Sequence, residues 1–159
     1  MNIAFFSHSG GLYGAERCLL EMVEVLMKEN NIIVILPQYG PLINELERKK
    51  IQYEIIPYYW WMNEGKTIYG VIKSILNINP IIKTIRLLKK WKVDIISTNT
   101  STINVGALTA YFLRVPHIWF IHEFRKEDPN HYFDLGKNLS YKFIEKTSKR
   151  IITNSKAVK

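Results

Sequence analysis

The sequence has little cysteine and no long apolar run. Cys18 is the single cysteine among 159 residues, so no disulfide forms within the chain, and we expect this thiol to be a small buried hydrophobic group. No stretch approaches the roughly 20 apolar residues of a membrane span. The start of the chain also lacks the basic leader and the length of a signal peptide. We therefore expect a cytoplasmic protein.

Acidic residues are scarce as well. Fourteen Asp and Glu stand against 22 Lys and Arg, which gives a formal net charge of +8. The basic residues concentrate in segments 83–92 and 137–150. Solvated helix faces are one interpretation, and attraction to anionic lipid or to a phosphorylated substrate is the other. Because no recognition motif accompanies the charge, we expect no nucleic-acid partner.

Short apolar runs alternate with helical patterns along the whole chain. The hydrophobic content of 47% is typical of a globular chain, and the length suits a single domain over residues 1–159. This alternation predicts an α/β fold with a doubly wound, Rossmann-like parallel sheet in the strand order 3-2-1-4-5-6. Strands are expected at 3–6, 32–36, 53–56, 93–97, 116–121 and 150–153, with helices at 15–26, 41–51, 67–91 (divided or kinked at Pro80), 103–113 and 134–148.

A glycine-rich turn joins the first strand to the first helix at Gly10, Gly11 and Gly14. Glycines let backbone N–H groups approach a ligand, and a helix N-terminus attracts anions, so the turn predicts a phosphate or other anion site. A turn that merely packs closely is the alternative. The dinucleotide fingerprint would require a glycine at Ser9 and an acid after the second strand, so NAD binding has little support.

Polar residues follow several strands at their carboxyl ends, where ligands of doubly wound folds bind. Thr98 and Asn99 follow the fourth strand, and His122 and Glu123 follow the fifth. We expect the glycine turn to face the Thr98 cluster, with His122 one strand away. A purely structural histidine is the alternative, and Glu123 could equally pair with Arg125.

Five large residues in succession, Tyr58 to Met62, match neither a helical nor a strand period. A loop folded onto the core is one interpretation. The other is an exposed patch that contacts a membrane interface or stacks on sugar rings. Together with the positive charge, the second interpretation predicts reversible docking on an anionic membrane.

Four segments in order carry a resemblance to a known family: Gly10 to Arg17, Gly40-Pro41-Leu42, Ile121-His122-Glu123 and Thr153-Asn154-Ser155-Lys156. Together they resemble the N-terminal domain of family 4 glycosyltransferases, which have the GT-B fold, and the resemblance covers essentially the whole chain. It implies transfer of a sugar from a nucleotide-sugar to a glycan or lipid-linked acceptor, with retention at the anomeric carbon and without a required metal or cofactor.

The resemblance also implies a division of labour. The N-terminal domain mainly holds the acceptor, and the C-terminal domain, which binds the nucleotide-sugar, is absent from these 159 residues. We therefore expect the N-terminal half of a truncated or split enzyme, inactive alone. The alternatives are a non-catalytic module that docks on a membrane or a partner, and half of a nucleotide-binding oxidoreductase.

Carried over by position, the resemblance assigns roles to individual residues. Gly10 and Gly11 approach the donor diphosphate, and His122 lies at the catalytic centre near the donor sugar. Glu16 could instead complement the helix dipole. Acceptor-binding roles are expected for Tyr13, Glu16, Thr98, Asn99 and Glu123.

Overall fold

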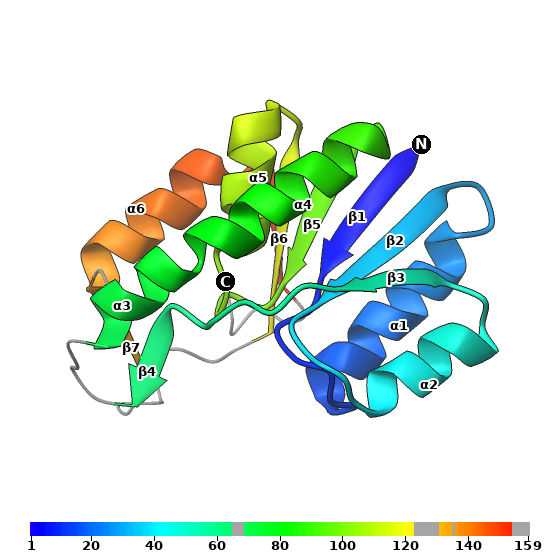
Figure 1. The fold of residues 1–159 in the computed structure, drawn as a ribbon, viewed down its shortest axis with the longest axis horizontal. Helices are drawn as coiled ribbons and strands as arrows, with labels where there is room; N and C mark the ends of the chain where they lie inside the picture. The colour runs from blue at the N-terminus through cyan, green and yellow to red at the C-terminus, as the bar shows by residue number, and fades with distance from the viewer. Residues whose placement is uncertain (65–68, 123–130, 135, 154–159) are drawn as a thin grey trace.

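A six-stranded parallel sheet forms the centre of the molecule (Figure 1). The computed structural model describes residues 1–64, 69–122, 131–134 and 136–153. The strand order is β3-β2-β1-β5-β6-β8, which confirms the predicted doubly wound sheet and its order. The strands are β1 (Asn2–Phe6), β2 (Asn31–Leu36), β3 (Gln52–Ile55), β5 (Ile95–Asn99), β6 (His117–Ile121) and β8 (Arg150–Thr153).

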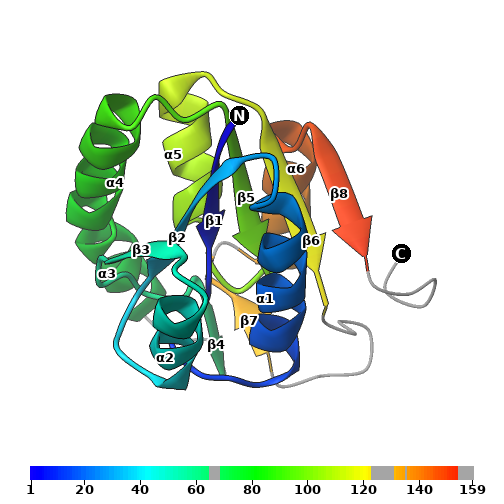
Figure 2. The same cartoon turned by 90° about the vertical axis from the view of Figure 1, so that its right-hand side faces the viewer.

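Helices cover both faces of this sheet (Figure 2). Successive side chains of β1 point to opposite faces of the sheet. Ile3 and Phe5 pack with α1 (Gly14–Leu26) and α2 (Pro41–Arg48). Ala4 and Phe6 pack on the opposite face. That face is covered by α4 (Ile78–Lys90), α5 (Val105–Leu113) and α6 (Lys137–Thr147).

A second, two-stranded sheet was not predicted from the sequence. β4 (Met62–Glu64) pairs antiparallel with β7 (His131–Phe133). Next to it, the ring of Trp61 stacks on Trp119 at a centroid distance of 6.4 Å and meets Phe133 edge-on at 5.1 Å. Trp61 and Trp119 are both buried and belong to one hydrophobic cluster with Phe133. This cluster extends the core from β6 to the small sheet.

The prediction of an exposed patch over Tyr58 to Met62 is wrong for most of its residues. Tyr58, Trp61 and Met62 are buried, whereas Tyr59 and Trp60 are partly exposed. The buried polar atoms have partners: the Trp61 indole donates to the carbonyl of Ser101 at 2.7 Å, and the Tyr58 hydroxyl lies 3.0 Å from the carbonyl oxygen of Ile35. The segment is therefore mainly a loop folded onto the core.

The helix predicted over 67–91 is two helices, α3 (Tyr69–Leu76) and α4. The break lies at Asn77, and Pro80 sits in the first turn of α4, where a missing N–H costs nothing. Cys18 is half-buried on α1 and not fully buried as expected. Within the described ranges, no helix combines the length and apolar character needed to cross a bilayer.

Candidate functional site

Two glycines hold the loops after β1 and β2 in direct backbone contact. A Cβ on Gly10 would lie 2.5 Å from the carbonyl oxygen of Gln38, and a Cβ on Gly40 would lie 2.1 Å from the carbonyl oxygen of Gly10. The Leu42 N–H donates to that same Gly10 oxygen at 3.1 Å. Both positions therefore require glycine for packing, and contact of Gly10 with a donor diphosphate stays a prediction.

Gly11 lies in a more open environment. A Cβ there would lie 2.9 Å from the ring of Tyr13 and 3.1 Å from Ser9 Oγ; Tyr13 is 77% exposed, so its ring has room to rotate away. The Gly11 N–H already donates to Ser9 Oγ at 3.0 Å. A diphosphate at Gly11 would have to compete with this bond, and the predicted contact is not tested by the geometry.

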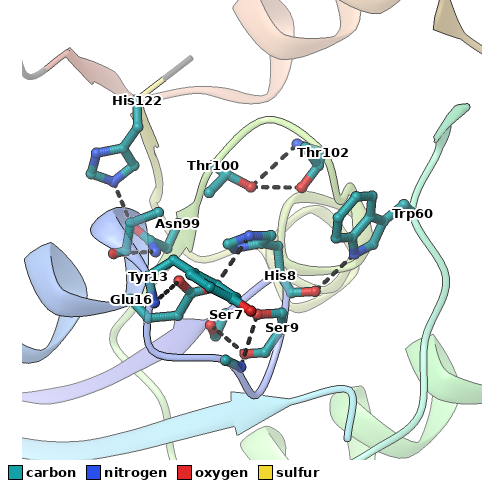
Figure 3. A network of polar contacts seen from close by, with 12 residues as sticks. Ser7, His8, Ser9, Tyr13, Glu16, Trp60, Asn99, Thr100, Thr102 and His122 are labelled. Atoms are coloured by element: carbon teal, nitrogen blue, oxygen red, sulfur yellow. Dashed lines mark hydrogen bonds and ion pairs between the residues drawn. The ribbon is translucent and has the colours of Figure 1, made fainter. Parts of the chain in front are cut away.

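The buried Glu16 carboxylate bonds to several residues of the turn between β1 and α1 (Figure 3). Its side chain is fully buried; Oε1 accepts from Ser9 Oγ at 2.6 Å and lies 3.2 Å from His8 Nε2, while Oε2 accepts from the Tyr13 N–H at 3.1 Å. The last bond is the reach-back half of a capping box, which satisfies a donor at the start of α1. The geometry gives Glu16 a structural role, and its predicted contact with an acceptor stays a prediction.

The carboxyl ends of β5 and β6 meet the first turn of α1 through Asn99. The Asn99 amide nitrogen donates to the carbonyl of Ala15 at 3.0 Å, and its Oδ1 lies 2.8 Å from His122 Nε2. Because Oδ1 can only accept, Nε2 of His122 carries a proton in this arrangement. The predicted neighbourhood of glycine turn, Asn99 and His122 is thereby observed, across the adjacent strands β1, β5 and β6.

Thr98 is buried beneath this cluster. Its Oγ1 lies 2.7 Å from Nε2 of His117, and a Cβ on Gly106 would come within 2.2 Å of the same oxygen. Burial lowers the pKa of His117 to about 3, so this imidazole is neutral at physiological pH. Thr98 thus joins β6 and α5 to the sheet, and its acceptor-binding role stays a prediction.

The remaining predicted residues divide into one that is accessible and one that is not described. Tyr13 is exposed at the N-cap of α1, where a ligand can reach its ring. Glu123 lies outside the described residues, as does the segment 154–156 of the last motif. Among the described residues, no group of three His, Cys, Asp or Glu side chains is placed to hold a metal ion.

Two residues of the site, His8 and Trp60, were not among the predicted site residues. The Trp60 indole donates to the carbonyl of His8 at 2.8 Å, and the two rings lie 5.6 Å apart (Figure 3). His8 is the second residue after β1, so the carboxyl-end rule that located His122 could have located it. Trp60 belongs to the aromatic run that was noted in the sequence, but its bond to His8 gave no signal there, because the two residues lie 52 positions apart.

Thr100, directly after β5, has a left-handed backbone with φ of 77°, which is uncommon for a β-branched residue. The bonds around it hold the conformation: its N–H donates to the carbonyl of Phe120 at 2.7 Å, and its hydroxyl lies 2.7 Å from that of Thr102. Strain of this kind is found where surrounding structure fixes a functional edge.

Comparison with known proteins gives the chain a family. Residues 13–159 match the model of Glycosyltransferase Family 4. The Anabaena protein HepE, solved with UDP and glucose, is similar over 99% of this chain and 39% of its own, with 23% identity and a TM-score of 0.75. In complex with UDP-glucose, the same protein gives 22% identity and a TM-score of 0.74, over 99% of this chain and 38% of its own.

A more distant fold match is MurG from Acinetobacter baumannii, with 14% identity and a TM-score of 0.67 over 96% of this chain and 40% of MurG. A comparison with curated proteins gave no significant match. At such identities these structures show the fold, and the chain spans about two fifths of their length, 38–40%. The family match covers most of the sequence, and the chain therefore belongs to glycosyltransferase family 4 as the N-terminal, Rossmann-like half of a GT-B fold.

Proposed function

We propose that this chain is the acceptor-side half of a retaining glycosyltransferase that moves a sugar from a nucleotide-sugar to a glycan or lipid-linked acceptor. Its family membership supports sugar transfer. Fold relatives solved with UDP and with UDP-glucose support a nucleotide-sugar donor. Those relatives are more than twice as long, which supports a second half that binds the nucleotide. The family match lends nothing to the oxidoreductase alternative.

The observation that carries the proposal is the bond between Asn99 and His122. It fixes an imidazole at the carboxyl edge of the sheet, one strand from the point between β1 and β5 where the chain reverses its direction of winding. Asn99 is itself bonded to the first turn of α1. Through Asn99, the His122 imidazole is oriented by β5 and α1 as well as by β6, the strand that it directly follows. An imidazole oriented in this way would offer a sugar a hydrogen bond of defined direction, which is what positioning in catalysis requires.

The start of α1 is the better candidate for the donor diphosphate. The Gly11 N–H is occupied by Ser9, whereas the first turn of a helix presents unpaired N–H groups and about half a positive charge. Gly14 begins this helix, is exposed, and has open space where a Cβ would be. Backbone donors there would stabilise the charge that develops on the leaving diphosphate without a metal ion.

The test uses the chain joined to its nucleotide-sugar-binding half. We expect His122→Ala to lower the transfer rate about 100-fold, since loss of a positioned group costs on this order, and Asn99→Ala to lower it in the same direction. Asn44→Ala, at an exposed position of α2, is the matched control and should leave the rate unchanged. Unaltered transfer by His122→Ala, with an unaltered melting temperature, would remove the imidazole from the mechanism.

A further inference from the structure

Six large hydrophobic side chains are exposed along the outer side of α3, α4 and the loop between β3 and β4. Three of them share one face of α3 at the spacing i, i+3, i+4, and two are one turn apart on α4. Each is between 41% and 61% exposed. We call this the α3–α4 surface; it consists of Tyr59, Ile72, Ile75, Leu76, Ile78 and Ile82.

Hydrogen bonds of buried side chains hold the residues of the α3–α4 surface in place. Asn77, buried at the junction of the helices, accepts from the Tyr59 N–H at 2.8 Å and donates to the Tyr59 carbonyl at 2.9 Å. On the inner side of α4, the hydroxyl of Thr84 lies 2.8 Å from that of Thr109 on α5. The exposed residues are therefore held in place by a packed interior and are not a frayed end.

A shallow depression lies within the surface, with a volume of about 330 Å³. Tyr59, Ile75 and Leu76 line it together with Pro57 and Lys83. An open, mainly apolar hollow with a lysine in its lining suits an acyl chain below a negatively charged headgroup.

The charged side chains of α3 and α4 themselves all have one sign, although Asp134 lies against α3 at Gly70. Residues 69–90 contain five basic and no acidic side chains. The exposed bases Lys83, Arg86, Lys89 and Lys90 follow the isoleucines along α4. Since Ile82, Arg86 and Lys90 are spaced four residues apart, they lie along one stripe of the helix. Apolar and basic groups on the same outer side are characteristic of helices that lie in a bilayer interface.

We propose that the α3–α4 surface docks this domain on an anionic lipid bilayer. A lipid surface fits better than a protein partner, because hot spots of protein interfaces are rich in Trp, Tyr and Arg, whereas five of these six residues are Ile or Leu. The surface differs from the patch predicted over Tyr58 to Met62, and it shares Tyr59 alone with it.

Docking in this way has a consequence for the site. In Figure 2, α3 lies towards the end of the molecule to which the strand arrows point, which is the edge that carries His122. The α3–α4 surface would therefore bring that edge close to the membrane. This consequence rests on the proposed function, whereas the docking itself does not.

The test is co-sedimentation of the 159-residue chain with vesicles, in the absence of any sugar donor. We expect binding to vesicles that contain phosphatidylglycerol and little binding to phosphatidylcholine alone. At about 1 M salt, where the Debye length falls to about 3 Å, binding should weaken strongly. If the chain ignores anionic vesicles at low salt, or binds both lipids equally, the proposal is wrong, while sugar transfer remains to be judged by its own assay.

Matched variants locate the surface. K83Q/R86Q/K89Q should bind roughly 100-fold more weakly, since each base near an anionic surface contributes about fivefold. K28Q/R48Q/K50Q removes the same charge from elsewhere and should bind within a few-fold of the parent.

For the apolar part, I75S/I78S should weaken binding at least about tenfold, since two aliphatic groups leave the interface. V25S, which alters an aliphatic residue on α1 that is 66% exposed, should bind as the parent does. Equal losses in the two charge variants, or in I75S/I78S and V25S, would show that the α3–α4 surface is not where the bilayer binds.

Discussion

Replacing Gly10 by alanine tests how the loops of the site are held together. The added Cβ would lie 2.5 Å from the carbonyl oxygen of Gln38 and 2.9 Å from the carbonyl carbon and oxygen of Tyr39. All three are backbone atoms, so relief requires the whole β2–α2 loop to shift. Such a shift would also break the bond from the Leu42 N–H to the Gly10 oxygen.

The cost can be worked out from these contacts. Overpacking costs about 1–3 kcal/mol, and the lost hydrogen bond adds about 1 kcal/mol, for a total of about 2–4 kcal/mol. In a chain of this length each kcal/mol lowers the melting temperature by about 2–4 °C. We therefore expect Gly10→Ala to lower it by about 5–15 °C, as followed by circular dichroism during heating.

Gly11→Ala is the matched control one residue away. Its Cβ would meet the exposed ring of Tyr13, which can rotate, so the cost should stay below about 1 kcal/mol and the fall below about 4 °C. If Gly10→Ala melts at the same temperature as Gly11→Ala or above it, the close backbone contact of Gly10 does not stabilise the fold.

Two further predictions concern stability. His117 has a pKa of about 3 in the folded protein and about 6.5 when unfolded. Below pH 6.5 the unfolded chain therefore binds a proton that the folded protein does not, and the free energy of unfolding should fall by about 1.4 kcal/mol per pH unit. Urea unfolding between pH 6.5 and 5 should show this slope, and His117→Gln should lack it; equal slopes would contradict a neutral buried imidazole. Arg114 ends α5 in a left-handed backbone conformation with φ of 57°. Because glycine adopts this conformation without strain, Arg114→Gly should raise the free energy of unfolding by about 1 kcal/mol. Arg86→Gly within α4 should lower the free energy of unfolding by about the same amount. If both glycine variants are less stable than the parent, the backbone at Arg114 is not strained.

The sheet could be predicted because its signals are local. Each main strand is a short apolar run bounded by turn residues, and the helices between them force parallel pairing in one hand. The carboxyl-end rule then placed Asn99 and His122 on neighbouring strands, and the structure adds the bond of 2.8 Å between them.

Contacts between distant segments could not be predicted in this way. Trp61 is buried because it meets Trp119, Phe133 and Phe143, all more than 50 positions away, and nothing in its own neighbourhood signals them. The packing of Gly10 against Gly40 depends in the same way on two loops of different strands. A helical segment over 67–91 was predicted, but its sequence does not reveal that several large apolar side chains of α3 and α4 face outwards.

Sugar transfer by the chain with and without its nucleotide-sugar-binding half is the most direct test of the proposed function. Catalysis requires donor and acceptor in one geometry, an effect worth roughly 7–11 kcal/mol, so the chain alone should transfer no measurable sugar from a UDP-sugar. The joined halves should restore transfer at rates typical of enzymes, on the order of 10 per second. Transfer at that rate by the chain alone, or none by the joined halves with any nucleotide-sugar, would contradict the assignment of this domain as the acceptor-side half.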